Sequence, residues 1–227
     1  MIKVILWDLD GTLLNFEKSE KFALKTCFTK FGLGDCGDEL IQRYSVINRK
    51  YWERLEQGLI SKTEVLEGRF CEFFTLEGIN CTDYQAFNNE YQVQLGETIS
   101  FCDNARELIQ ELKQHVRQYI VTNGTLTAQE KKLKKSGLHT LVDGVFISDV
   151  IGYEKPDLRF FEEVFRNIGD CQKEEMLIVG DSLTSDMEGG RRAGIKCVWY
   201  NPNGMENTSD ISLFAEIRQL QKIKELL

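Results

Sequence analysis

Two aspartates, one residue apart, follow a short apolar segment near the start of the chain. Residues Val4–Trp7 are all apolar, and Asp8, Asp10, Gly11 and Thr12 come directly after them. Such a run is typical of a buried strand, and parallel sheets carry their chemistry at the carboxyl ends of strands. Two carboxylates this close repel each other unless a cation compensates them, and Mg²⁺ with oxygen ligands suits that task. A simple Asp-Gly turn explains this one segment equally well.

Three later segments repeat the pattern of an apolar strand followed by residues able to bind or react. They are residues 118–124 with Thr122, Asn123 and Gly124, residues 145–157 with Lys155, and residues 176–186 with Asp181, Ser182 and Asp186. The four strand ends thus offer an aspartate pair, a Thr-Asn pair, a lysine and a second aspartate pair. Together they favour a catalytic site over four unrelated loops.

The order of these motifs resembles the haloacid dehalogenase (HAD) superfamily of phosphohydrolases. The matching strings are Asp-x-Asp-Gly-Thr, Thr-Asn-Gly, Lys-Pro and Gly-Asp-Ser-x-x-x-Asp, which run from Asp8 to Asp186. Further strings, at residues 7–16, 47–52, 68–70 and 152–156, resemble the pyrimidine 5′-nucleotidase (YjjG-like) branch of that superfamily. The resemblance implies a phosphatase that hydrolyses phosphomonoesters.

The catalytic roles follow from that resemblance. Asp8 is expected to attack phosphorus and form an aspartyl phosphate, which splits one difficult step into two. Asp10 is expected to protonate the leaving oxygen and then to deprotonate the attacking water. Lys155 is expected to stabilise the transition state and to restrain the nucleophile.

Binding roles follow in the same way. Thr122, with the backbone N–H groups of Asn123 and Gly124, precedes an expected helix N-terminus, which is a favourable place for phosphoryl oxygens.

By resemblance the Mg²⁺ ligands are Asp8, the backbone carbonyl of Asp10, and Asp181. Asp186 is expected to hold a metal-bound water or to orient Lys155, and Ser182 is expected with Asp186 among the residues that surround the ligands.

Between residues 16 and 94 the strand pattern disappears, and four helices are expected instead. They cover residues 16–31, residues 38–57, residues 61–74 after a Ser-x-x-Glu capping box, and a stretch from Thr82 or Asp83 to about Leu95. We therefore expect a helical cap domain at residues 16–92, inserted into a core made of residues 1–15 and 93–227. The resembled superfamily carries its type 1 helical cap at this position.

After residue 100 strands and helices alternate. Helices are expected at residues 104–114, 125–136 and 185–193 and from Pro156 onward, and a fifth strand at residues 196–200. Alternation of this kind predicts an α/β fold, a Rossmann-like parallel sheet core with helices on both faces. No G-x-G-x-x-G string follows the first strand, which argues against a dinucleotide site.

The leaving group must be recognised by the cap and by the residues just after Asp10. Candidates are Asn15, Phe16, Asn48 and Arg69, with Phe16 able to stack on a flat base. Trp52 lies on an apolar helical stripe and is expected to pack inside the cap. Arg69 is expected to be a surface residue rather than one that binds the substrate.

The favoured substrate is a nucleoside 5′-monophosphate, with a small sugar phosphate or phosphoglycolate as the alternative. Asp10 argues against a dehalogenase, which needs no acid at that position. Phosphomutase activity is not excluded by the sequence. A signalling receiver domain also uses Asp, Thr and Lys around Mg²⁺, but it is far shorter and has no helical insert after its first strand.

Composition limits the partners. The chain has 227 residues, a formal net charge of −8 and no basic block, which argues against a nucleic-acid polymer. Its seven cysteines form no C-x-x-C pair, as expected of reduced thiols. No signal peptide and no apolar run of about 20 residues is visible, so no membrane partner is expected. These features predict a cytoplasmic protein, monomeric or homodimeric, with a small phosphorylated substrate.

Overall fold

The computed structural model describes residues 1–207 and 209–227 and contains a six-stranded sheet. Its strands are β1 (Val4–Trp7), β2 (Arg117–Thr122), β3 (Gly144–Ile147), β4 (Met176–Gly180), β5 (Lys196–Tyr200) and β6 (Ala215–Ile217). All neighbours are parallel, in the order β3-β2-β1-β4-β5-β6. The chain winds outward in both directions from β1, so the crevice typical of such sheets opens where β1 ends. The predicted parallel α/β core is confirmed.

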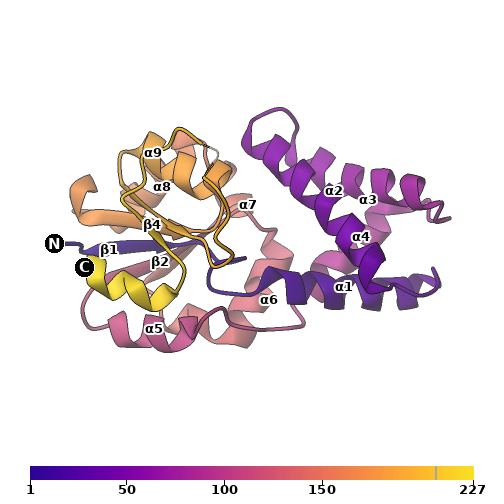
Figure 1. The fold of residues 1–227 in the computed structure, drawn as a ribbon, viewed down its shortest axis with the longest axis horizontal. Helices are drawn as coiled ribbons and strands as arrows, with labels where there is room; N and C mark the ends of the chain where they lie inside the picture. Colours follow the sequence, from indigo (N-terminus) through magenta and orange to yellow (C-terminus); the bar gives the residue numbers. More distant parts are fainter. Residues whose placement is uncertain (208) are drawn as a thin grey trace.

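Helices cover both faces of this sheet because the side chains of each strand alternate (Figure 1). Ile5 and Trp7 of β1 pack with α5 (Ala105–Leu112), α6 (Leu126–Ser136) and the C-terminal turn η4 (Leu220–Leu226). Val4 and Leu6 pack with α8 (Leu158–Ile168) and α9 (Glu188–Ala193) on the opposite face. The shorter elements are η1 (Leu138–Thr140), α7 (Ser148–Ile151), η2 (Lys173–Glu175) and η3 (Leu183–Met187).

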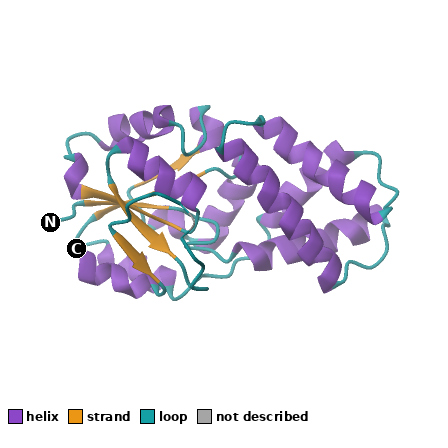
Figure 2. Cartoon of the chain, turned by 45° about the horizontal axis from the view of Figure 1, so that its top comes forward, coloured by secondary structure: helices purple, strands orange, loops and turns teal. Residues whose placement is uncertain are grey.

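Four helices form a separate bundle beyond the carboxyl ends of the strands (Figures 1 and 2). They are α1 (Phe16–Phe31), α2 (Asp38–Glu56), α3 (Lys62–Glu77) and α4 (Tyr84–Leu95). Closely packed aromatic rings fill the interior, among them Phe28, Phe70, Phe73, Phe74 and Phe87. The bundle therefore has an apolar core of its own.

Local capping chemistry explains where these helices begin. The predicted capping box is present at the start of α3, where Ser61 and Glu64 bond each other's backbone N–H groups. The expected start of a helix at Pro156 is wrong by two residues. Asp157 caps α8 by accepting a hydrogen bond from the N–H of Arg159, so the helix begins at Leu158.

Two features of the second half differ from the sequence prediction. The expected helix at residues 185–193 consists of the wide turn η3 followed by α9. A sixth strand, β6, pairs with β5 at one edge of the sheet. With three residues, β6 is too short to show a periodic pattern in the sequence.

Two further observations concern the expected partners and thiols. All seven cysteines are free. Among the helices of the described chain, none combines the length and the apolar character that a bilayer span requires.

Candidate active site

Three carboxylates and one lysine meet where β1 and β4 end. Carboxylate oxygens of Asp8, Asp181 and Asp186 lie within 4.8 Å of one another. The Nζ of Lys155 donates to Asp8 (2.7 Å), to Asp186 (2.6 Å) and to the carbonyl oxygen of Val121 (2.8 Å). One ammonium group among three carboxylates leaves an excess of negative charge. A hard divalent cation with oxygen ligands fits this donor set.

The electrostatics of the buried groups lead to the same conclusion. Burial raises the pKa of Asp8 to about 7, and the Asp186 carboxylate adds to the rise while Lys155 opposes it. Burial alone would lower the pKa of Lys155, but Asp186 and Asp8 outweigh it and hold that pKa above its ordinary value. Asp8 therefore needs a second cation to stay fully ionised at neutral pH.

Two glycines let the backbone come close to this cluster. A Cβ on Gly11 would lie 2.4 Å from a carboxylate oxygen of Asp181, and Gly11 also has a φ of +93°. A Cβ on Gly180 would lie 2.2 Å from the carboxylate of Asp186. Side chains at these two positions would collide with the acids, so glycine is required for the acids to converge.

The wide turn η3 returns the chain so that Asp186 faces Asp8. The Ser182 hydroxyl accepts a hydrogen bond from the N–H of Ser185 (3.0 Å) and caps the turn. The N–H of Ser182 donates to one oxygen of Asp186 (3.2 Å), while the other oxygen binds Lys155. Turns with this wide π geometry occur frequently at functional sites. Asp186 thus contacts Lys155, and Ser182 contacts Asp186.

The Thr-Asn-Gly segment adjoins the cluster from the end of β2. The side chain of Asn123 donates to the carbonyl of Lys155 and accepts from its N–H, both at 2.8 Å. The Thr122 hydroxyl accepts from the N–H of Gly124 (3.2 Å). The sequence pointed to the backbone of Asn123. The side chain of Asn123 also holds the loop that carries Lys155, which was not predicted.

Asp10 lies beside the cluster and is bound by two residues of α6 that the sequence interpretation missed. Lys132 Nζ contacts both Asp10 carboxylate oxygens (2.6 and 2.8 Å), and Gln129 Nε2 donates to one of them (2.7 Å). Gln129 and Lys132 are three residues apart and share one helix face. In the sequence they look like ordinary polar helix residues, and only their spacing after Thr-Asn-Gly was available as a signal.

Two of the specificity candidates lie at the start of α1. The side-chain oxygen of Asn15 accepts from the N–H of Lys18 (3.0 Å) and caps the helix. The ring of Phe16 is partly buried, and its centroid lies 5.3 Å from Lys132 Nζ. Phe16 is therefore adjacent to the lysine that binds Asp10.

The other two candidates lie inside the bundle. Arg69 is 1% exposed, and it donates to Asn48 (2.8 Å) and Asn88 (2.9 Å). Asn48 in turn donates to Glu20 (2.9 Å). The expected surface position of Arg69 is wrong, because amide partners compensate the buried guanidinium. Trp52 is half-buried and lies outside the apolar interior where it was expected.

A further carboxylate, missed in the sequence, reaches the site from the bundle. Glu56, the last residue of α2, accepts hydrogen bonds from the hydroxyls of Thr184 and Ser182. Burial raises the pKa of Glu56 to about 8; the Thr184 hydroxyl opposes the rise and Asp186 adds to it. Glu56 connects the bundle to the turn η3.

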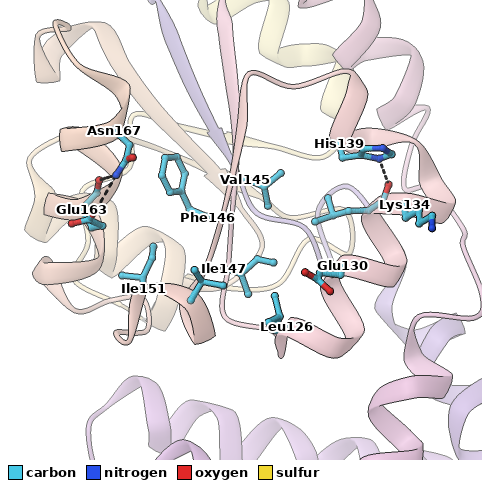
Figure 3. Close-up of a pocket in the computed structure, with 12 residues that line it drawn as sticks. Leu126, Glu130, Lys134, His139, Val145, Phe146, Ile147, Ile151, Glu163 and Asn167 are labelled. Atoms are coloured by element: carbon cyan, nitrogen blue, oxygen red, sulfur yellow. Dashed lines mark hydrogen bonds between the residues drawn. The ribbon is translucent and has the colours of Figure 1, made fainter.

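A separate open pocket lies beside the edge strand β3, between α6 and α8 (Figure 3). Val145, Phe146 and Ile147 of β3 line it together with Leu126, Glu130, Leu133, Lys134, His139, Val150, Ile151, Glu163 and Asn167. No candidate site residue occurs among these lining residues. Its lining contains none of the clustered carboxylates that could hold a metal, so the reaction is expected at the carboxylate cluster.

Comparison with known proteins identifies relatives along the whole chain. The family model described as haloacid dehalogenase-like hydrolase matches residues 5–200. The HAD-hydrolase YfnB of Bacillus subtilis is 34% identical over 225 residues, covering 99% of this chain and 95% of YfnB. The crystal structure of YfnB bound to magnesium, reported to reveal interdomain movement, superposes with a TM-score of 0.94 at 33% identity, covering 100% of this chain and 98% of that one.

Two enzymes of stated activity are also similar. Pyrimidine 5′-nucleotidase PynA of Streptococcus pneumoniae is 34% identical over 226 residues, covering 99% of this chain and 94% of PynA. Glyceraldehyde 3-phosphate phosphatase of Methanothermobacter thermautotrophicus is 26% identical over 234 residues, covering 98% of this chain and 100% of that enzyme. The resemblance seen in the sequence motifs is confirmed by these relatives.

Proposed function

The chain belongs to the haloacid dehalogenase-like hydrolase family, and from that premise we propose a Mg²⁺-dependent phosphatase that acts on nucleoside 5′-monophosphates, with pyrimidine nucleotides preferred. The observation that carries the proposal is the position of Lys155, whose ammonium group binds Asp8 and Asp186 at once beside Asp181. That arrangement restrains one carboxylate as a nucleophile and leaves the neighbouring acids for a metal.

Asp8 is the nucleophile of this proposal. Lys155 binds its Oδ1. The other carboxylate oxygen attacks phosphorus, the bond from phosphorus to the leaving oxygen breaks, and an aspartyl phosphate forms. Thr122, Asn123 and Gly124 bind the phosphoryl oxygens at the N-terminus of α6.

Asp10 moves the protons in both half-reactions. It first gives a proton to the leaving alkoxide oxygen, which would otherwise depart as a poor leaving group. The carboxylate that results then takes a proton from the water that attacks the aspartyl phosphate. The phosphate is released, and Asp8 and the protonated Asp10 are ready for the next cycle.

The metal in this proposal is held by Asp8, Asp181 and the backbone carbonyl of Asp10, with Asp186 holding Lys155. When bound, Mg²⁺ offsets the charge of the carboxylates and of the phosphate and lets the two anions approach. Support comes from the donor set, with oxygens of Asp8 and Asp181 inside one 4.8 Å group, and from the magnesium-bound structure of YfnB.

We further propose that residues 16–92 act as a mobile cap over a core of residues 1–15 and 93–227. The bundle has its own apolar interior. Polar pairs connect it to the core: Glu56 with Thr184, Lys62 with Asp149, and Gln92 with Thr125. Polar contacts re-form with water at little cost, so they allow a cap to open for substrate and close to exclude bulk water.

The nucleotide preference rests on the similarity to PynA and on Phe16, an aromatic residue beside the partner of Asp10. The glyceraldehyde 3-phosphate phosphatase relative supports a second candidate, a small sugar phosphate. The chemistry at Asp8 is the same in both cases, and the two candidates differ only in what the cap must recognise.

A substrate panel tests the proposal. It contains dUMP, dTMP, glyceraldehyde 3-phosphate, phosphoglycolate, hexose phosphates and p-nitrophenyl phosphate, each with Mg²⁺ and with excess EDTA. We expect the highest kcat/KM for the pyrimidine nucleotides and no turnover in EDTA. A clear preference for the triose or hexose phosphates contradicts the nucleotide assignment only, whereas inactivity on the entire panel contradicts the phosphatase itself.

The Phe16→Ala variant tests base recognition within the same panel. Stacking on a base contributes about 1–3 kcal/mol in nucleic-acid sites. At roughly 1.4 kcal/mol per tenfold change, KM for dUMP should rise by about one to two decades. KM for p-nitrophenyl phosphate should change little, and equal losses on both substrates would instead indicate general packing.

A further inference from the structure

The carboxyl group of Asp10 is held by two side chains of α6. Three hydrogen bonds converge on it, two from Lys132 Nζ and one from Gln129 Nε2, all between 2.6 and 2.8 Å. Lys132 has a side chain that is 1% exposed, and that of Asp10 is 20% exposed. A lysine is almost never buried without a partner, and here the partner is the acid and base of the reaction.

Gln129 joins Asp10 to the predicted phosphate-binding segment. Its Nε2 donates both to Asp10 and to the Thr122 hydroxyl (2.9 Å), and its side chain is fully buried. A Cβ at Gly124 would lie 1.7 Å from this nitrogen, so any larger residue there would displace Gln129. Glycine is thus required at position 124 for a reason that is independent of phosphate binding.

The same helix is anchored to the bundle. The ring of Phe16 lies over Lys132 Nζ, and the hydroxyl of Thr125, which caps α6, donates to Gln92 of α4 (2.7 Å). Ala128 of α6 packs into the apolar interior of the bundle. One face of α6 therefore contacts the bundle while Gln129 and Lys132 hold Asp10.

We propose that Lys132 and Gln129 are positioning residues that fix the Asp10 carboxyl group for proton transfer to the leaving oxygen. The inference rests on the proposed phosphatase mechanism, in which Asp10 is the acid. General acid–base catalysis contributes about 10²–10⁴-fold, but only when the acid is held in a productive geometry. A carboxyl group freed to rotate loses much of that factor.

The leaving group gives the test, because kcat/KM reports the steps up to its release. A nucleoside alkoxide needs the proton from Asp10, whereas p-nitrophenolate leaves readily without it. Lys132→Met should lower kcat/KM for dUMP by about 10–100-fold. The same variant should lower kcat/KM for p-nitrophenyl phosphate by less than about threefold. Lys134→Met, at an exposed lysine of the same helix, is the matched control and should leave both values unchanged.

A double-mutant cycle separates positioning from general packing. In an Asp10→Asn background there is no acid to position, so adding Lys132→Met should cost less than about twofold more on dUMP. Gln129→Met provides a second test should Lys132→Met not fold, and it should show the same dependence on the leaving group. Equal losses on the two substrates, no loss on dUMP, or an undiminished loss in the Asp10→Asn background would each overturn the proposal.

Failure of this inference is distinguishable from failure of the proposed function. Wild-type turnover with Mg²⁺, and its loss in Asp8→Asn, do not depend on Lys132 or Gln129. If those two results hold while Lys132→Met affects both substrates equally, the phosphatase assignment stands and the positioning role is wrong.

Discussion

At the scale of single residues, Lys155 decides whether the carboxylates can share one site. Its Nζ binds Asp8 and Asp186, and all three side chains are at most 10% exposed. Removal of one member of a buried ionic group leaves the others uncompensated, which typically costs about 3–5 kcal/mol. The ion pairs of Lys155 therefore stabilise the folded protein as well as holding Asp8 in place.

We predict that Lys155→Met loses turnover and, in metal-free buffer, lowers the free energy of unfolding by about 3–5 kcal/mol. Mg²⁺ should restore part of that loss, because it supplies the missing positive charge and binds only the folded protein. Urea unfolding with EDTA and with Mg²⁺ measures both effects. Arg159→Met, at an exposed ion pair with Asp157, is the control and should change stability by less than about 1 kcal/mol.

If Lys155→Met leaves the free energy of unfolding in EDTA unchanged, the carboxylates do not depend on Lys155 to compensate their charge, and the prediction is wrong.

The sequence was sufficient to predict the position of residues that belong to the four motifs. It was not sufficient for residues that reach the site only because one helix packs against a distant part of the chain. Asp8, Lys155 and Asp181 could be predicted because each follows an apolar strand. Lys132 and Glu56 could not, because the sequence shows only charged residues on amphipathic helices. The burial of Lys132 and the contacts of Glu56 result from how α6 and α2 pack against loops that lie far away in the chain.

At the scale of elements, the end of α2 and the turn η3 are joined by the partly buried carboxylate of Glu56. The pKa of Glu56 is raised from 4.5 to about 8, chiefly by burial. The folded protein therefore holds a proton on Glu56 that the unfolded chain releases above about pH 4.5. Stability is lost as pH rises from about 4.5 to about 8, and the loss is complete above pH 8.

The Glu56→Gln variant should remove this dependence. Glutamine keeps the hydrogen bonds to hydroxyl groups but cannot ionise, so the variant should match wild type near pH 5 and exceed it in Tm at pH 8 and above. Thermal unfolding in metal-free buffer from pH 5 to pH 9 measures the difference. Glu53→Gln, an exposed neighbour on the same helix, is the control. A Tm difference that is constant with pH would contradict a buried, protonated Glu56.

Element boundaries were predictable where a capping side chain marks them. Ser61 and its partner Glu64 mark the start of α3, and Gly32 in the left-handed conformation ends α1 at the predicted residue 31. The start of α8 was misplaced because Pro156 is also favourable in a first turn, and only the geometry shows that Asp157 makes the capping bond. The sequence offered no way to distinguish these two starts.

At the scale of the whole molecule, the helical bundle lies beyond one end of the sheet (Figure 1), and the two parts have separate apolar interiors. They meet through polar contacts around the site and through Ala128 of α6, which packs into the interior of the bundle. The sequence predicted the four helices of the bundle and the alternating strands and helices of the sheet, since both patterns are long and distinct. It could not predict how they dock, because Lys62 and Asp149, which form an ion pair across the contact, are separated by 87 positions.

We predict that the proposed cap moves relative to the core. Removing two of the three connecting side chains in a Glu56→Ala, Lys62→Ala double variant should increase the radius of gyration of the metal-free protein in small-angle X-ray scattering. Addition of Mg²⁺ and orthovanadate, a phosphate analogue, should lower it again in wild type. Lys50→Ala, at an exposed ion pair with Glu72 inside the bundle, is the control. Scattering profiles that agree in all these states would argue for one rigid body.

Detection of the aspartyl phosphate itself tests the proposed mechanism most directly. The protein is mixed with ³²P-labelled dUMP and Mg²⁺, quenched in acid within the first turnover, and digested for peptide mapping. Catalysis through Asp8 should leave a hydroxylamine-labile label on the peptide that contains Asp8, absent from Asp8→Asn and from samples in EDTA. Phosphate release at the full rate with no label on the protein, or a label on any other residue, would contradict it.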